Sequence, residues 1–148
     1  MTTIRECMTD DHRHCDDIFA ETEQALASKQ LALAQTAFAR FREAMLAHFS
    51  VEEKTLFPAF ESATGMTMGP TQVMRMEHEQ MRALLNEAEA ALAAGREDDY
   101  FGQAETLLIM MQQHNMKEEN VLYPMCDQHL AASADDLIDQ LESGLAAL

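Results

Sequence analysis

A segment of eleven residues occurs twice in the sequence, and this internal repeat constrains the fold more than any other feature. The segment from His48 to Pro58 reads HFSVEEKTLFP, and it recurs 66 residues later, from His114 to Pro124, as HNMKEENVLYP. Both copies share the pattern His-x-x-x-Glu-Glu-x-x-Leu, followed by an aromatic residue and proline. The same offset aligns the flanking residues, so we expect two similar halves, over about residues 4–60 and 70–126.

Apolar residues in each half recur at alternating spacings of four and three, which is typical of an α-helix that packs on one face. Before the first copy this series contains Met8, His12, Cys15, Phe19, Thr22 and Leu26. Before the second copy it contains Met74, His78, Met81, Leu85, Ala88 and Leu92. Each half therefore predicts one helical hairpin, and two hairpins predict an all-α, up-down four-helix bundle.

Glycine and proline mark the expected ends of these helices. We expect the second helix to end at Pro58 and the fourth to end at Pro124 or slightly beyond. The loop Gly65–Gly69 separates the two halves, and Pro70 suits the first turn of the third helix. A short C-terminal helix is expected over about residues 133–147, and the 148 residues are predicted to form a single domain.

The charge of the chain excludes some classes of partner. Ten Lys and Arg residues against 26 Asp and Glu residues give a formal net charge of −16. Such a charge repels phosphate backbones and anionic membrane surfaces, so we expect neither nucleic acid nor membrane as a partner. The cysteines Cys7, Cys15 and Cys126 form no C-x-x-C pair, which argues against a disulfide framework or a zinc ribbon and favours a cytoplasmic location.

Six ionisable residues occupy positions that a helical bundle normally fills with leucine or alanine. They are His12, His48, Glu52, His78, His114 and Glu118. Burial of each without compensation would cost several kcal/mol, against a net stability of roughly 5–15 kcal/mol for a typical domain. Metal coordination provides this compensation. Residues four apart lie on one helix face, so each His-x-x-x-Glu presents an imidazole and a carboxylate to the core.

The residue types favour two metal ions, each bound by two histidines, with the two glutamates bridging between them. Four imidazoles and two carboxylates without a thiolate favour iron or manganese, whereas zinc more often occupies a closed site with four ligands. We predict two iron (Fe) ions, with manganese (Mn) or zinc (Zn) as the weaker alternatives. Ferritin-like bundles are a competing class, but their motif is Glu-x-x-His, with a spacing of three residues.

These motifs together resemble the hemerythrin-like (HHE) cation-binding domains. The resemblance rests on the two repeated segments and on an acidic residue directly before His12 and His78, and it covers nearly all of residues 4 to 126. It implies a carboxylate-bridged, non-haem di-iron centre with an oxo or hydroxo bridge, and it maps the ligands onto the same six residues. Glu119, next to Glu118, is an alternative ligand.

One departure from the family pattern bears on function. The invertebrate oxygen carriers of this family use a fifth histidine, four residues after the position of His78. This position is Arg82 here, and its repeat mate is Asp16. We therefore expect both metals to keep an exchangeable coordination position. The pattern of four histidines and two glutamates is similar instead to bacterial di-iron proteins associated with the repair of damaged iron centres and with nitric oxide chemistry.

The sequence thus predicts a di-iron protein whose centre reacts with O2, peroxide or NO, in a redox or repair role. An electron donor or an iron-acceptor protein is a possible partner. A module that senses oxygen or iron, and an iron store or donor, are the alternative functions. Glu53 and Glu119 either accept hydrogen bonds from ligand imidazoles or face the solvent. Asp11 and Glu77 either help to deliver protons or are ordinary surface carboxylates.

Overall fold

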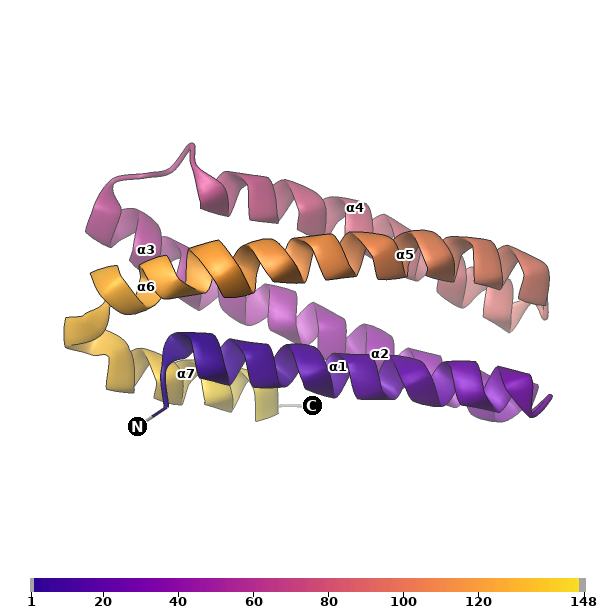
Figure 1. The fold of residues 1–148 in the computed structure, drawn as a ribbon. Helices are drawn as coiled ribbons and strands as arrows, with labels where there is room; N and C mark the ends of the chain where they lie inside the picture. Colours follow the sequence, from indigo (N-terminus) through magenta and orange to yellow (C-terminus); the bar gives the residue numbers. More distant parts are fainter. Residues whose placement is uncertain (1, 147–148) are drawn as a thin grey trace.

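Two antiparallel helical hairpins form the bundle (Figure 1). The first hairpin pairs α1 (Ile4–Ala27) with α2 (Leu31–Val51), and the second pairs α4 (Pro70–Ala93) with α5 (Glu97–Lys117). The computed structural model describes residues 2–146. It confirms the predicted all-α bundle of two repeated hairpins with a short C-terminal helix.

The second helix of each hairpin contains a π-helical turn and continues beyond it. In the first hairpin η1 (Glu52–Leu56) leads into α3 (Phe57–Thr64), and in the second hairpin η2 (Glu118–Leu122) leads into α6 (Tyr123–His129). The N–H of Phe57 donates to the carbonyl oxygen of Glu52, five residues earlier, and Tyr123 donates likewise to Glu118. Each π-turn therefore begins at a predicted ligand.

The predicted end of the second helix at Pro58 is wrong, because this helix continues to Thr64. Proline normally ends a helix because its ring clashes with the carbonyl group four residues earlier and because it donates no hydrogen bond. The π-turn before Pro58 moves the preceding carbonyl groups out of α-helical register, so the ring is accommodated. The same arrangement lets the fourth helix run past Pro124 to His129.

The turns that connect the helices of each hairpin have the same geometry. The N–H groups of Gln30 and of its counterpart Arg96 each donate to a carbonyl oxygen five residues earlier, at 2.9 Å. The preceding residue has a left-handed backbone in both turns, with a φ of 57° at Lys29 and 71° at Gly95. Glycine adopts this conformation freely, whereas the Cβ of lysine makes it unfavourable.

A short C-terminal segment covers the bundle near the N-terminus of α1 (Figure 1). The single 3₁₀ turn η3 (Ala131–Ser133) leads into α7 (Ala134–Ala146), which packs against α1, α2 and η1. Position 147, where we expected this helix to end, lies outside the described residues. Gly144 permits the close packing, since a Cβ at this position would clash with the Cγ1 atom of Val51.

The apolar core consists of two clusters with a polar layer between them. One cluster lies toward the hairpin turns and includes Phe38, Phe41 and Leu85. The other lies beneath α7 and includes Phe60 and Leu141. The predicted metal ligands occupy the intervening helical turns, so the bundle holds polar side chains at the level where its two cores meet. Across residues 2–146, no helix is both long enough and apolar enough to cross a bilayer.

Candidate metal centre

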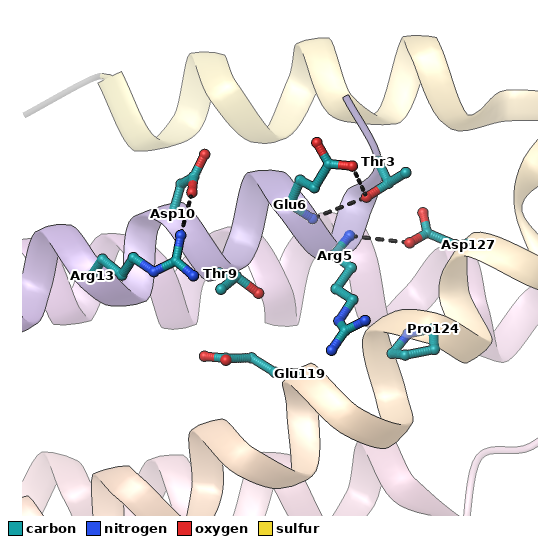
Figure 2. Close-up of a pocket in the computed structure, with 9 residues that line it drawn as sticks. All are labelled: Thr3, Arg5, Glu6, Thr9, Asp10, Arg13, Glu119, Pro124 and Asp127. Atoms are coloured by element: carbon teal, nitrogen blue, oxygen red, sulfur yellow. Dashed lines mark hydrogen bonds and ion pairs between the residues drawn. The ribbon is translucent and has the colours of Figure 1, made fainter. Parts of the chain in front are cut away.

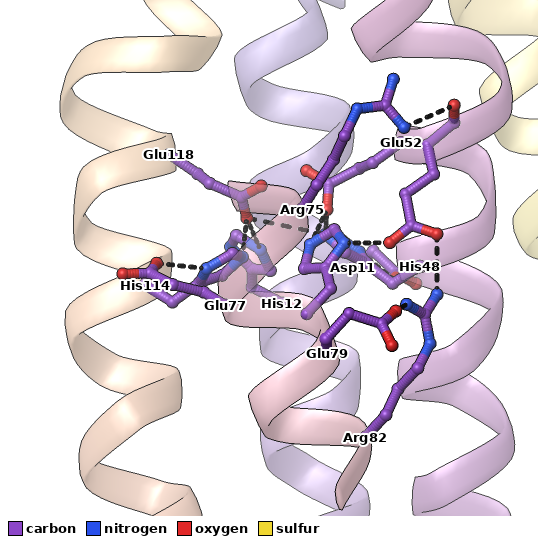
Figure 3. Close-up of polar contacts among 12 residues, drawn as sticks. Asp11, His12, His48, Glu52, Arg75, Glu77, Glu79, Arg82, His114 and Glu118 are labelled. Atoms are coloured by element: carbon purple, nitrogen blue, oxygen red, sulfur yellow. Dashed lines mark hydrogen bonds and ion pairs between the residues drawn. The ribbon is translucent and has the colours of Figure 1, made fainter. Parts of the chain in front are cut away.

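The structure brings all six predicted ligands together in the bundle interior. Their relative exposures are 5% for His12, 2% for His48, 0% for Glu52, 0% for His78, 2% for His114 and 0% for Glu118. Each comes from a different element, and Figure 3 shows several of them converging on one region between the helices. This burial agrees with the core positions that the sequence periodicity gives them.

The ligand atoms form two groups that share one carboxylate. One group contains Glu52, His78, His114 and Glu118, and the other contains His12, His48 and Glu118. In each group, one ligand atom per residue lies within 4.8 Å of all the others. Each group has the size and the donor types of a site for one cation, and the shared Glu118 places the two sites next to each other.

Both carboxylates lie close to histidines of the two groups. The Oε1 atom of Glu118 is 3.1 Å from Nε2 of His12 and 3.2 Å from Nε2 of His114. The Oε1 atom of Glu52 is 3.2 Å from Nε2 of His78 and 3.4 Å from Nε2 of His48. Each glutamate therefore contacts one imidazole from each hairpin, which is the position that a bridging carboxylate requires.

The Nδ1 atom of every imidazole in the centre contacts an outer carboxylate. The four contacts are His12 to Glu119 at 2.6 Å, His48 to Asp11 at 2.8 Å, His78 to Glu53 at 2.6 Å, and His114 to Glu77 at 2.8 Å. An imidazole that donates from Nδ1 keeps its Nε2 lone pair free for a metal, and the carboxylate fixes the ring orientation. Of the two roles considered for Glu53 and Glu119, the structure shows the hydrogen bond to an imidazole.

These outer contacts follow a regular pattern across the repeat. Asp11 and Glu77 each hold a histidine of their own hairpin. Glu53 and Glu119, by contrast, each hold a histidine of the opposite hairpin. The two glutamates of each Glu-Glu pair therefore have different positions, since the first faces the centre and the second connects the hairpins. Glu119, which we considered as an alternative ligand, contacts the outer side of His12.

An arginine and a lysine side chain help to lower the pKa of two outer carboxylates, Glu53 and Glu77. Burial alone would raise the pKa of Glu53, but hydrogen bonds from His78 and Arg82 lower it to about 2. The Nη2 atom of Arg82 lies 2.8 Å from Oε1 of Glu53. Burial also opposes ionisation of Glu77, yet hydrogen bonds from Lys117 and His114 lower its pKa. Arg82 thus supports the carboxylate that orients the predicted ligand His78.

Several buried polar atoms of the centre lack a hydrogen-bond partner, as expected of atoms that bind a cation. Among the described residues, Oε1 of Glu52, Nε2 of His78, Nε2 of His114 and Oε2 of Glu118 are buried and accept or donate no hydrogen bond. The 3.2 Å contact between His78 and Glu52 lacks hydrogen-bond geometry. An unpaired buried polar atom costs about 1–3 kcal/mol. A cation bound among these nitrogen and oxygen atoms would satisfy all four.

Tyr123 is a member of the centre that our sequence interpretation missed. Its hydroxyl oxygen lies 2.8 Å from Oε2 of Glu52, 3.0 Å from Oε1 of Glu118 and 3.2 Å from Nε2 of His48. Burial and the charges of the two glutamates raise the pKa of Tyr123 well above its usual value, so the hydroxyl keeps its proton when no cation competes. The repeat did indicate that this residue is unusual, because the matching residue of the first copy, Phe57, has no hydroxyl.

A surface cavity of about 580 Å³ lies beside the centre (Figure 2). Glu119 forms part of its wall, and the same carboxylate holds His12. Arg5 and Arg13 also line the cavity. At its edge Asp127 accepts hydrogen bonds from the backbone N–H groups of Ile4 and Arg5, at 2.8 and 3.2 Å, which ties α6 to the start of α1.

A buried set of four histidines and two glutamates inside a four-helix bundle defines a metal-binding helical protein. The family model of the hemerythrin HHE cation binding domain matches residues 3–126, and the chain belongs to this family. The matched range contains both hairpins and every residue of the two ligand groups. Neither a curated protein nor a solved structure matches the chain.

Proposed function

We propose that this protein binds two iron ions between its hairpins and that the loaded centre reacts with O2, peroxide or NO. The observation that carries the proposal is the arrangement of Glu52 and Glu118, each of which contacts an imidazole from both hairpins. Two adjacent groups of nitrogen and oxygen donors suit a pair of ions better than one. A lone structural cation would need only one of these groups.

In this proposal His12 and His48 hold one ion, His78 and His114 hold the other, and the glutamates lie between them. Iron suits this donor set, because imidazole and carboxylate are its usual protein ligands where thiolates are absent. The three cysteines belong to the apolar clusters, Cys15 to the first and Cys7 and Cys126 to the second. Manganese and zinc are the alternatives that a metal analysis distinguishes.

The chain itself orients the imidazole rings, supplies the negative charges around them and keeps water away from the ligand atoms. The four outer carboxylates hold the imidazole rings with Nε2 toward the centre, so the ligands are ordered before a cation binds. Burial removes competing water from the ligand atoms. When bound, the two ions would supply redox chemistry and coordination positions for a small molecule. Arg82 and Asp16 stand where a fifth imidazole would otherwise fill such a position.

Iron loading under anaerobic conditions tests the ligand set. We expect two iron ions per chain in the wild-type protein and loss of at least one in His12→Ala. The matched control is His14→Ala, because His14 is an exposed histidine on the same helix. Equal iron content in the wild-type protein and His12→Ala would contradict the assignment.

Rapid mixing of the reduced, iron-loaded protein with O2, hydrogen peroxide and NO tests the reactivity. We expect the absorption spectrum to change with at least one of the three, at a rate that depends on its concentration. Free ferrous iron at the same concentration is the control. A protein that holds two iron ions but whose spectrum stays constant with all three would refute the proposed reactivity and leave an iron store as the better interpretation.

A further inference from the structure

We propose that Tyr123 is a seventh protein ligand of the centre and that its phenol oxygen binds the metal held by His12 and His48. The inference rests on the proposed function, since it requires metal in the site. It also makes the two metal positions chemically different, although the repeat would otherwise make them equivalent.

The distances around the hydroxyl match those between neighbouring ligands of one metal. Its oxygen lies 2.8 Å from Glu52 Oε2, 3.0 Å from Glu118 Oε1, 3.2 Å from His48 Nε2 and 3.3 Å from His12 Nε2. Ligands at about 2.1 Å from an octahedral metal lie about 3.0 Å from each adjacent ligand and about 4.2 Å from the opposite one. All four contacts of Tyr123 correspond to adjacent positions.

The other separations in this group agree with the same geometry. Nε2 of His12 is 3.1 Å from Oε1 of Glu118, as expected for adjacent ligands. Nε2 of His48 is 4.0 Å from the same oxygen, as expected for opposite ligands. The phenol oxygen therefore completes a set whose members already have the spacing of a shared coordination sphere.

Hydrogen bonding alone does not account for this arrangement. The hydroxyl of Tyr123 faces two carboxylates at once, Glu52 at 2.8 Å and Glu118 at 3.0 Å, and both only accept hydrogen bonds. Tyr123 has a single proton, so it donates to one of them and its oxygen lies against the other without a donor between them. A cation bound here would take the phenol oxygen as a ligand and release its proton to solvent, as bound metals do with other acidic ligands.

Within residues 2–146, the second metal position has no donor that corresponds to Tyr123. Phe57, the repeat mate of Tyr123, stacks on His78 with ring centroids 5.8 Å apart, and Tyr123 stacks on His12 at 5.7 Å. The two rings therefore occupy matching places, but only one carries an oxygen atom. The metal held by His78 and His114 consequently keeps the coordination position that Tyr123 fills on the other metal.

Resonance Raman spectroscopy of the ferric protein tests this ligand, because a phenolate bound to Fe(III) gives a visible charge-transfer band that enhances its ring vibrations. We expect these vibrations in the wild-type protein and in Tyr100→Phe, and their loss in Tyr123→Phe. Tyr100 is the matched control, since it is the other tyrosine of the chain and is also fully buried. Its hydroxyl donates to Glu23, away from the centre.

The wild-type protein alone also provides a test if Tyr123→Phe does not fold. Incorporation of ring-deuterated tyrosine should shift the enhanced vibrations, and Tyr100→Phe should show the same shift. Two bound ferric ions without any tyrosine vibration would overturn the ligand assignment and leave the proposed function intact. A wild-type protein that binds no iron would overturn both.

Discussion

Glu119 on the second hairpin and His12 on the first lie 2.6 Å apart, between Oε2 and Nδ1. This hydrogen bond lowers the pKa of Glu119 and orients the imidazole. Its repeat mate, from His78 to Glu53, has the same length. Two such contacts connect the hairpins at the level of the centre, so a predicted ligand of each half is positioned by a residue of the other.

We expect Glu119→Gln to lower the affinity for iron about 10- to 100-fold, which is the usual effect of losing a carboxylate that orients a metal-bound histidine. The amide retains an acceptor but lacks the charge that strengthens the contact. Competition with a chelator of known affinity measures the change. Glu105→Gln is the control, because Glu105 is exposed on α5. Equal weakening in both variants would attribute the effect to net charge.

Lys29→Gly should stabilise the protein by about 1 kcal/mol, since glycine adopts the left-handed backbone of this position without the penalty of a Cβ. Lys29→Ala should have little effect, because alanine retains the Cβ. Thermal unfolding of the three proteins measures the difference. If Lys29→Ala were as stabilising as Lys29→Gly, the loss of the lysine charge would explain the gain.

Gly144→Leu should destabilise the protein by about 1–3 kcal/mol, because the new side chain must displace Val51 or move α7 away from α2. Gly102 provides the control, since a Cβ there would meet no heavy atom of residues 2–146 within 4 Å. We expect Gly102→Leu to be as stable as the wild-type protein or more so, through its higher helix propensity. Denaturant titration checks both variants, and unchanged stability in Gly144→Leu would argue against close packing of α7.

Cys7 should resist alkylation at neutral pH. Burial and the charges of Glu142, Asp11 and Asp10 raise its pKa from 9.0 to about 11. Only the thiolate reacts, so the reactive fraction at pH 8 is about 100-fold lower than for a thiol of pKa 9, and it rises as the pH approaches 11. Mass spectrometry of peptides after timed iodoacetamide treatment measures the rate, with the denatured protein as reference. Rapid labelling of native Cys7 at pH 7 would contradict this environment.

The repeat predicted both hairpins because it combined a helical period with matching ligand positions. The structure brings the six predicted ligands together, and it decides between the two roles that the sequence left open for Glu53 and Glu119. Local sequence rules failed at Pro58, where proline normally ends a helix. The π-turn that accommodates Pro58 forms because the N–H of Phe57 donates to the carbonyl oxygen five residues earlier, and not to the one four residues earlier. Tertiary packing decides between these two acceptors, and no single residue type indicates which one is used.

Tyr123 was missed for a related reason. The sequence shows that it replaces the phenylalanine of the first copy, but aromatic residues before a proline usually pack in the core. Whether its hydroxyl reaches Glu52 depends on the rotation of α6 relative to α5, which the π-turn η2 sets. Asp11 and Glu77 were left between proton delivery and an ordinary surface position, and neither interpretation included their contacts with His48 and His114.

Each hairpin supplies one carboxylate, Glu53 or Glu119, that orients a histidine of the other hairpin. Two separate copies of either hairpin, related by a twofold axis, would contain the same set of crossed contacts. In a single chain the two hairpins are covalently linked, so each meets the other at a fixed effective concentration. Their sequences can also differ. The hydroxyl carried by Tyr123 and lacking in Phe57 is an asymmetry that a symmetric pair of identical hairpins would be unable to build.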